Sequence, residues 1–426
     1  MSKFQLIVTG IFAGLIVIGV IIFSIARSGT GGPPSSVTIW GTYDRISFEA
    51  YLQEIFGGDD AISVTYQQKR AATFESELLE ALASGKGPDV IFLPHDFLYQ
   101  YRNLLYPIPY ETYSERAYLD TFVGAGEIFM GAGGIYGLPF MIDPLILYWN
   151  RDILESEGIA APPRYWHEFV GLSERLSRKD EKGNLVRSTV AFGEFVNVSH
   201  AKDILSLLFL QAGNPLVQRT GTGFLSLLNE KLGQELPPVE AALRFYTDFA
   251  NPSKSLYSWN RSLPISESRF LSGDLAFYIG FASEVEKIKQ KNPNLNYDVV
   301  ALPQLSTSKN QITYADLTAL ALTKNVKNYT AALRVITELT SADAEARLVR
   351  FTKLPPTRRD LLSVLPKDPY LSIFYGAAVR ARSWLDPDPE STANIFQSLV
   401  ETVTGGRARI GEAMVKANNQ LQGLFK

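Results

Sequence analysis

Strand-like and helix-like segments alternate along this chain, and that alternation constrains the fold more than any other feature. Short runs rich in Val, Ile, Leu and aromatic residues, typical of buried strands, are separated by segments with apolar residues at helical spacing. In residues 73–83, for example, Phe74, Leu78, Leu79 and Leu82 recur close to a 3.6-residue period. The alternation predicts an α/β protein.

The expected elements extend from residue 37 to the C-terminal region. Strands are predicted at residues 37–40, 63–67, 89–93, 275–279, 297–301 and 317–323. Helices are predicted at residues 47–55, 73–83, 203–211, 239–250, 284–291, 328–340, 342–351 and 410–424. A chain of 426 residues is long enough for two or three domains or lobes.

Composition and charge exclude several classes of protein and site. The net charge of −3 argues against a nucleic-acid-binding protein, which needs a basic surface. The chain has no cysteine, so it forms no disulfide, no cysteine zinc site and no lipid-modified cysteine. Aromatic residues make up 12% of the chain, enough to fill a core and also to line a binding site.

The N-terminal region is expected to lie outside the folded part. Residues 6–26 carry no charge and as a helix would span about 31 Å, enough to cross the hydrocarbon core of a bilayer. We expect a single-pass membrane anchor in residues 1–27 and a Gly/Pro/Ser linker in residues 28–36, with the folded part extracellular or periplasmic. A cleaved signal peptide is the alternative, because Ser24-Ile25-Ala26 fits a small-x-small cleavage site.

No catalytic or metal-binding motif stands out in the sequence. The three histidines, His95, His167 and His200, lack a metal-ligand spacing such as HExxH. The glycine-rich segments at residues 124–126 and 131–134 lack the strand–turn–helix context of a nucleotide site. We therefore predict no cofactor, no metal and no enzymatic activity. A glycosidase remains the enzyme alternative, because carboxylates are numerous.

Aromatic and polar side chains follow the ends of predicted strands, where ligands bind in open α/β sheets. Six such residues follow the first and third strands: Trp40, Thr42, Tyr43, Asp44, His95 and Asp96. Aromatic faces stack on the apolar faces of a sugar, while carboxylates bind its hydroxyls. Trp259 and Trp384, which lie in predicted turns, are further candidates for such contacts. For each tryptophan, and for Tyr43, a place in the core is the alternative.

Several segments, in order along the chain, resemble the extracellular solute-binding proteins of ABC importers. The similarity is closest to the carbohydrate-binding, maltose-binding-protein-like family. It rests on GKGPDV at residues 85–90, GIYGLP at residues 134–139, LYWNRDIL at residues 147–154, PPRYWHEF at residues 162–169, FLSGDLAF at residues 270–277 and the helical stretch at residues 319–340. The resemblance extends from residue 37 to the C-terminus.

The resemblance implies two α/β lobes that close on a ligand about crossing strands, the type II periplasmic-binding-protein fold. The first lobe is expected to comprise residues 37–140 and 304–340, and the second residues 144–300 and 341–403. Crossings are expected near residues 140–143 and 301–303, with a third soon after Thr340. The C-terminal helix, within residues 404–426, is expected to pack on the first lobe.

The resemblance also implies which residues contact the ligand. To the six strand-end residues it adds Asp143 at the first crossing, Phe281 where the family often has a tryptophan, and Tyr314 and Asp316 in place of a glycine-rich loop. Phenylalanine at this point still stacks but lacks the indole hydrogen-bond donor.

The function implied is that of a non-enzymatic, monomeric receptor. It captures a solute, expected to be a sugar or oligosaccharide, between its lobes and delivers it to the permease subunits of an ABC transporter. A sensor that signals to a membrane protein, and a binder of a non-sugar solute, are the alternatives, because the sequence does not separate them.

Overall fold

The computed structural model describes residues 34–221 and 223–425. The predicted anchor at residues 1–27, and with it the alternative signal peptide, lies outside the described residues. Within the described ranges, no helix is long and apolar enough to cross a membrane. Each strand and each helix predicted from the sequence overlaps an observed element of the same type.

A single long sheet runs through both halves of the molecule. Its main path is β2 (Ile62–Gln68), β1 (Ser35–Gly41), β3 (Val90–Pro94), β13 (Thr313–Leu322), β6 (Leu138–Asn150), β11 (Leu275–Phe281), β8 (Leu185–Val190) and β7 (Arg178–Lys179). Two further strands, β12 (Tyr297–Val300) and β14 (Ala381–Arg382), pair with β6 and β13. Separate two-stranded sheets are formed by β4 (Met130–Gly131) with β5 (Gly134–Ile135), and by β9 (Val217–Thr220) with β10 (Gly223–Ser226).

The first lobe has an apolar core on each face of its part of this sheet. Its helices are α2 (Arg45–Phe56), α3 (Phe74–Ala83), α4 (Leu98–Tyr101), α5 (Glu115–Thr121), α12 (Tyr329–Leu339), α13 (Ala342–Thr352) and α14 (Arg359–Leu362). Phe48, Phe92 and Phe140 meet edge to face and tilted in one of these cores, which fixes α2 on the sheet.

The second lobe is built around one large apolar core. Its helices are α6 (Arg151–Ser156), α7 (Phe169–Leu176), α8 (Ala201–Gln211), α9 (Pro238–Asp248), α10 (Ser266–Leu271), α11 (Glu284–Lys291), α16 (Pro389–Thr404) and α17 (Ile410–Gln422). α8 is apolar almost all round and is buried on nearly every side, as expected for a core helix. The remaining helix, α15 (Pro369–Arg380), packs against β6 and β13.

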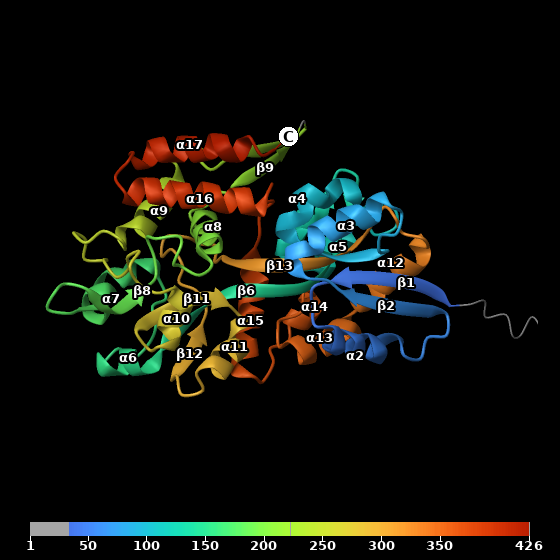
Figure 1. Ribbon diagram of the computed structural model, residues 1–426, viewed down its shortest axis with the longest axis horizontal. Coiled ribbons are helices and arrows are strands. Elements are labelled where there is room, and N and C mark those ends of the chain that lie inside the picture. Colours follow the sequence, from blue (N-terminus) through green and yellow to red (C-terminus); the bar gives the residue numbers. More distant parts are fainter. Residues whose placement is uncertain (1–33, 222, 426) are drawn as a thin grey trace, which may run out of the picture.

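Three strands pass between the lobes: β6, β13 and β14. Figure 1 shows β6 and β13 side by side in the middle of the molecule, with helices of one lobe to the left and of the other to the right. Along β13, Tyr314 belongs to the second-lobe core, whereas Ala315 belongs to the first-lobe core. The chain therefore crosses within β13.

This arrangement corrects the predicted position of two crossings. The second crossing is not at residues 301–303, because residues 304–312 stay bonded to the second lobe. Gln304 accepts a hydrogen bond from the Trp166 amide (3.2 Å), and Gln211 donates to the Ile312 carbonyl (2.8 Å). The third crossing is β14 rather than a segment soon after Thr340.

The packing of two helices also differs from the prediction. α13 was expected in the second lobe, but it contacts α2, and its Leu348 is buried in the first-lobe core. α17 was expected on the first lobe, but it packs against α16, α9 and β10 of the second lobe. Each helix packs its apolar face on the lobe where it lies. The order of the elements along the sequence does not show which lobe that is.

Candidate functional site

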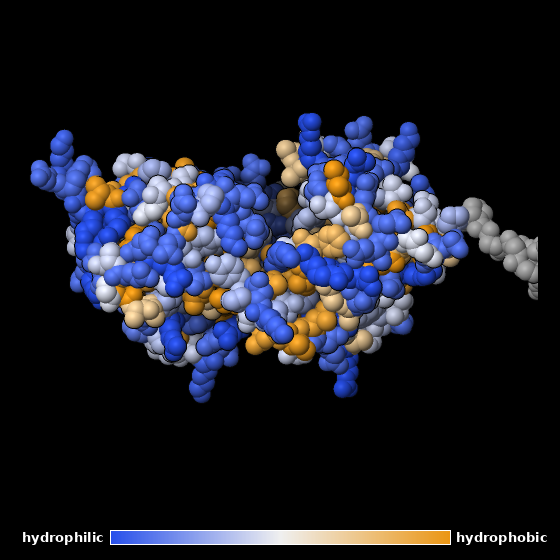
Figure 2. All heavy atoms as spheres, turned by 90° about the horizontal axis from the view of Figure 1, so that it is seen from below, coloured by the Kyte–Doolittle hydropathy of each residue, from blue (hydrophilic) through white to orange (hydrophobic). Residues whose placement is uncertain are grey.

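Polar side chains from both lobes converge where β6 and β13 cross. The space-filling view shows that the surface is hollowed between the two lobes (Figure 2). β1 and β3 of the first lobe end toward this region, and the segments after β11 and before α8 approach it from the second lobe. The crossing strands thus form the floor on which residues distant in sequence meet.

Asp143 of β6 and Asp316 of β13 are paired across the two crossing strands. The Asp143 carboxylate is half-buried and accepts a hydrogen bond from the Ser283 amide (3.1 Å). Burial and then the charge of Glu284 raise the pKa of Asp143 to about 6.

The Asp316 side chain reaches solvent but lies deep between the lobes, with protein on most sides. Removal from bulk water, followed by the charges of Asp203, Asp96 and Asp143, raises its pKa well above the ordinary aspartate value. The floor of the site thus holds two carboxyl groups that keep their protons to a higher pH than ordinary aspartates.

His200, immediately before α8, forms an ion pair with Glu284 (Nε2 to Oε1, 2.6 Å). Glu284 also accepts hydrogen bonds from the Tyr278 hydroxyl (2.6 Å) and the Phe281 amide (3.0 Å). Burial acts to lower the pKa of His200, but its hydrogen bond and the charge of Glu284 outweigh burial and raise it. The imidazole also meets the edge of Phe281, with ring centres 4.9 Å apart.

Lys202 forms ion pairs with a carboxylate of each lobe. Its Nζ lies 3.0 Å from the Asp386 carboxylate in the second lobe and 3.6 Å from that of Asp96, which follows β3 in the first lobe. Burial opposes the charge of Lys202, but Asp386 and Asp96 raise its pKa. The neighbouring Asp203 is half-buried, and burial raises its pKa to about 6 against the opposing charges of Lys202 and His200.

His95 and Tyr314 form a buried pair beneath these charges. The Leu317 amide donates to Nδ1 of His95 (3.3 Å), so Nε2 carries the ring proton and donates it to the Tyr314 hydroxyl (3.1 Å). Burial lowers the pKa of His95 to about 4, which keeps the ring neutral. The pair fixes the end of β3 against β13.

The structure brings most of the residues predicted for the site together. Those at or directly beneath the crossing are Tyr43, His95, Asp96, Asp143, Phe281, Tyr314 and Asp316. Burial, with the charges of Asp143 and Asp316, raises the pKa of the Tyr43 hydroxyl. Thr42 is exposed beside Tyr43. Asp44 is also exposed, but its carboxylate is occupied as the N-cap of α2, accepting from the Ser47 amide (2.8 Å).

The tryptophan predictions need correction. Trp259 is fully buried, donates to the Asn197 side chain (3.1 Å) and belongs to the second-lobe core. Trp384 is also buried there and donates to Ser206 (3.1 Å). Trp40 packs in the first-lobe core beneath Lys69, whose Nζ lies 3.7 Å from the ring centre. These rings are buried and stabilise the lobes.

Sequence reasoning missed the second-lobe side of the site. The residues concerned are His200, Lys202, Asp203, Ser283 and Glu284. Two signals were available. A histidine and a charged pair open the predicted apolar helix at residues 203–211, and Ser283 and Glu284 follow a buried strand just as Thr42 and Tyr43 do.

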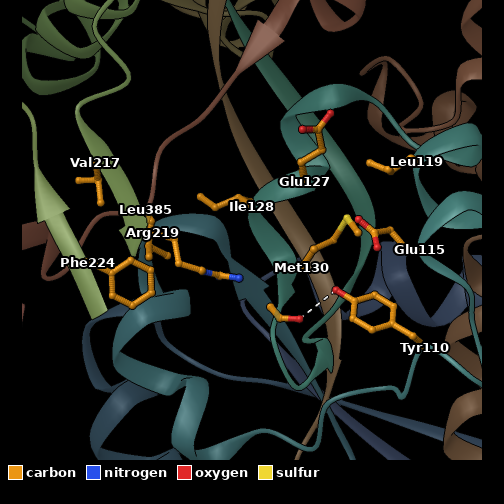
Figure 3. Close-up of a pocket in the computed structure, with 11 residues that line it drawn as sticks. Tyr110, Glu115, Leu119, Glu127, Ile128, Met130, Val217, Arg219, Phe224 and Leu385 are labelled. Carbon is orange, nitrogen blue, oxygen red and sulfur yellow. Dashed lines mark hydrogen bonds between the residues drawn. The ribbon is translucent and has the colours of Figure 1, made fainter. Parts of the chain in front are cut away.

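A second cavity, of about 440 Å³, lies between the lobes, lined by the first lobe and by the β9–β10 hairpin. Figure 3 shows Tyr110 and Met130 on one wall opposite Val217 and Phe224, with the Arg219 side chain extending into the space. The Tyr110 hydroxyl donates to the Gly131 carbonyl (2.9 Å) and so shapes the first-lobe wall. Because its walls belong to different lobes, the volume of this cavity depends on how the lobes are placed.

No group of three or more His, Cys, Asp or Glu side chains in residues 34–221 and 223–425 is arranged to hold a metal ion. The carboxylates at the crossing are close enough to repel one another but do not converge on a single point. Their arrangement suits hydrogen bonding and charge pairing with an extended organic solute.

Residues 48–369 match the protein family described as "Bacterial extracellular solute-binding protein". The chain is 21% identical over 416 residues to the galactooligosaccharide-binding protein of Bacillus subtilis (strain 168), covering 95% of this chain and 92% of that protein. The resemblance seen in the sequence therefore extends over nearly the whole length of a known binding protein.

Solved structures share the architecture. The cyclic alpha-maltosyl-1,6-maltose binding protein from Arthrobacter globiformis superposes with a TM-score of 0.77 at 14% identity, covering 92% of this chain and 99% of that one. The sugar-binding protein MalE from Xanthomonas citri gives 0.72 at 20% identity, covering 92% and 97%. At these identities the likeness shows the fold, and it confirms the predicted two-lobed α/β architecture.

Proposed function

Because this chain belongs to the family of bacterial extracellular solute-binding proteins, we propose that it captures a sugar or oligosaccharide between its lobes and delivers it to an ABC transporter. One observation carries the proposal: side chains of both lobes and of the crossing strands meet at one place, with Asp96 from the first lobe, Asp143 and Asp316 from the crossing, and Asp203 from the second lobe. A solute seated there touches both lobes at once. The names of relatives such as the galactooligosaccharide-binding protein support a saccharide.

The ligand contacts we propose lie on the open side of the crossing. The Tyr43 ring supplies an aromatic face, and Thr42, Asp96, Asp143 and Asp316 supply hydrogen-bonding groups. His95, Tyr314 and Phe281 lie beneath them and hold the floor in place.

Closure of the lobes, and no chemical step, is the proposed mechanism. A ligand shifts the equilibrium between open and closed forms only as far as it binds the closed form better. Moving the population from about 1:99 to about 99:1 requires a preference of about 10⁴-fold for the closed form. Contacts made to both lobes at once supply such a preference, because they are complete only when the lobes approach.

The same proposal includes attachment to the membrane as a monomer. Residues 6–26 would anchor the chain, and residues 28–34 would tether the lobes outside the cytoplasm, because Ser35 and Ser36 of the predicted linker belong to β1. Fractionation of cells expressing the full chain, compared with a chain lacking residues 1–27, tests the anchor. The full chain is expected in the membrane fraction, and recovery of both forms as soluble protein contradicts it. Light scattering of the shortened chain tests the monomer.

Calorimetry and thermal shift against a panel of neutral mono- and oligosaccharides test the saccharide. At least one saccharide is expected to release or take up heat and to raise the unfolding temperature, because binding to the native state stabilises it. Asp143→Asn and Tyr43→Ala are expected to weaken that binding. A folded protein that responds to no saccharide in the panel contradicts the proposal.

A further inference from the structure

The long sheet ends in the first lobe at β2, and the outer edge of this strand is open. Among the described residues, β2 pairs with β1 alone. In Figure 1 it lies on the far side of β1 from β13. A groove of about 680 Å³ follows the open edge, lined by β2 and by Leu52, Gln53 and Phe56 of α2. An open strand edge is a template for a further strand.

The bonds to β1 show which backbone groups of β2 face the groove. The Ser35 amide donates to the Ala61 carbonyl (2.9 Å), just before the strand. The Lys69 amide donates to the Gly41 carbonyl (2.7 Å), just after it. Residues 61 and 69 thus point toward β1, and the alternation along a strand gives residues 63, 65 and 67 the same direction. The outward backbone groups are those of Ile62, Val64, Tyr66 and Gln68.

The sequence of β2 does nothing to protect this edge. Natural sheets usually block an open edge with a charged residue, a proline or a bulge. Residues 62–68 read ISVTYQQ, with no charge, no proline and no glycine. Ile, Val, Thr and Tyr are among the residues that favour strands. The edge is therefore suited to pairing with another strand.

We propose that β2 pairs with β2 of a second copy of this chain, antiparallel about a twofold axis at Thr65. In this register residues 62 and 64 lie opposite residues 68 and 66 of the second copy, so the outward backbone groups of both strands meet. A twofold contact uses the same surface on both copies and is complete with two of them.

Side chains of matching character meet on both faces of the paired strands. On the core face, Val64 lies opposite Tyr66, which gives a β-branched residue an aromatic neighbour. On the outer face, the exposed side chains of Ser63 and Gln67 lie opposite each other, and Thr65 faces its own copy across the axis. Cross-strand pairs of these kinds stabilise a sheet.

The charges at the two ends of β2 select this register. Asp60 precedes the strand and Arg70 follows it, both exposed and neither in an ion pair within the described residues. An axis at Thr65 places Asp60 opposite Arg70 of the second copy, at both ends of the interface. An axis at Val64 or Tyr66 also joins outward backbone groups, but it leaves both charges without an opposite charge. Charge complementarity thus identifies a second copy as the occupant of the edge.

The pairing is expected to be weak. One strand from each copy makes a small interface, and small interfaces belong to transient complexes. The chain is then a monomer at micromolar concentration, as proposed above, and pairs when it is concentrated. Copies held in one membrane by the proposed anchor would meet under such conditions. The crossing stays free, because β1 and β3 separate β2 from β13.

Cysteine cross-linking of the full chain tests the pairing, because the chain has no cysteine of its own. The two copies of residue 65 form a pair without mutual hydrogen bonds, in which Cα atoms lie about 4.5 Å apart, within reach of a disulfide. Oxidation with copper phenanthroline is therefore expected to link Thr65→Cys into a dimer. Ser63→Cys, also exposed and on the same face, is the matched control, because its two copies would lie about 13 Å apart along the strands.

Charge exchange tests the register in the Thr65→Cys background. Asp60→Lys alone and Arg70→Asp alone place like charges opposite each other, so each should lower the yield of linked dimer severalfold. The double variant restores opposite charges and should recover the yield. A double variant that links as poorly as the single variants overturns the axis at Thr65.

Sedimentation of the full chain in detergent, from about 1 μM to about 1 mM, measures the pairing without a cross-link. The wild type is expected to shift from monomer to dimer. Thr65→Lys brings two ammonium groups together at the axis and should stay a monomer throughout. The pairing is overturned if Thr65→Cys links no faster than Ser63→Cys, or if the wild type and Thr65→Lys associate alike. Capture of a saccharide is decided separately by the panel, so the two proposals fail independently.

Discussion

Asp143 of β6 and Asp316 of β13 lie opposite each other where the two strands pass between the lobes. They come from segments far apart in the sequence, and the strand register places both carboxylates on one face of the crossing. Burial raises the pKa of both carboxyl groups, and the charge of Asp143 raises that of Asp316 further, so ionising both at once weakens the sheet in the free protein. The same two carboxyl groups can bind a ligand. The pair therefore lowers the stability of the free protein and provides binding groups at the crossing.

Asp316→Asn is expected to stabilise the free protein. Because the pKa of Asp316 is raised in the folded protein, folding at neutral pH must either protonate this group or place its charge opposite Asp143. Asparagine avoids that cost, which is about 0.2–1 kcal/mol for a like-charged cross-strand pair. Urea unfolding at neutral pH measures the gain, with Asp120→Asn, which removes an exposed carboxylate on α5, as control. A loss of stability would mean that Asp316 has a favourable partner that outweighs the repulsion.

Glu345 makes the stability of the first lobe depend on pH. The carboxyl group is fully buried in α13 and lies 2.6 Å from the Thr357 hydroxyl, which also donates to the Pro139 carbonyl (3.0 Å). A hydroxyl has one proton, so a protonated Glu345 satisfies both contacts best. Burial raises the pKa of Glu345 to about 8, despite the hydrogen bonds from Thr357.

A raised pKa in the folded state means that the protonated form is stabilised by folding. The contribution of protonated Glu345 to the free energy of unfolding is complete below the ordinary glutamate pKa of 4.5. It is lost as the pH rises through about 8. The unfolding temperature should therefore fall across that window, and Glu345→Gln, a neutral mimic of the acid, should flatten the slope. An unchanged slope in Glu345→Gln would place the titrating group elsewhere.

Substitutions of Trp259 should affect mainly the stability of the protein, whereas substitution of Tyr43 should affect mainly ligand binding. Trp259→Ala empties a fully buried site and is expected to cost about 3–5 kcal/mol in unfolding free energy. Trp259→Phe, which retains most of the ring volume, should cost less and leave ligand affinity unchanged. Tyr43→Ala should instead weaken ligand binding with a smaller loss of stability. If Trp259→Phe alone abolishes binding, the core assignment is wrong.

Lys202 should be the most costly cation to remove from the crossing. Its ammonium pairs with Asp386, which is 1% exposed, and breaking a buried pair by removing one partner costs about 3–5 kcal/mol. Lys202→Met should show a loss approaching that range, reduced because Lys202 itself is partly exposed. The double variant Lys202→Met with Asp386→Asn should recover part of the loss. If the loss in the double variant equals the sum of the losses of Lys202→Met and Asp386→Asn measured separately, the two groups act independently.

The sequence allowed the elements to be predicted because periodicity is a local property. The helix predicted at residues 284–291 coincides with α11, for instance. The crossing in β13 was not predictable in the same way, because it depends on Gln304 and Ile312 remaining bonded to the second lobe. The local sequence pattern predicts whether a segment is a helix or a strand, whereas long-range hydrogen bonds determine the lobe to which it belongs.

The site was predicted on its first-lobe side and at the crossing, and less well elsewhere. Strand ends identified Tyr43 and Asp96, but residue type alone could not show that Trp259 faces inward, since an aromatic ring suits a core as well as a site. Lys202 and Asp203 were missed because their role depends on where α8 points, and that is set by packing across the whole lobe.

His200 combines a charge pair with an unfavourable backbone conformation. Its φ of 58° lies in the left-handed region, which costs a non-glycine residue about 1–2 kcal/mol. The bond to Glu284 outweighs burial and raises the pKa of His200. The ion pair therefore stabilises the folded protein fully below the ordinary histidine pKa of 6.5, and this stabilisation is lost as the pH rises through the raised pKa. His200→Ala should remove this pH dependence and retain the strain.

His200→Gly removes the same pair but relieves the backbone, so it is the matched variant. It should be more stable than His200→Ala by about 1 kcal/mol, reduced by the greater flexibility of glycine in the unfolded chain. Thermal unfolding across the titration range of histidine measures both effects at once. The pair assignment fails if His200→Ala keeps the pH dependence of the wild type. The strain assignment fails if the alanine variant is the more stable of the two.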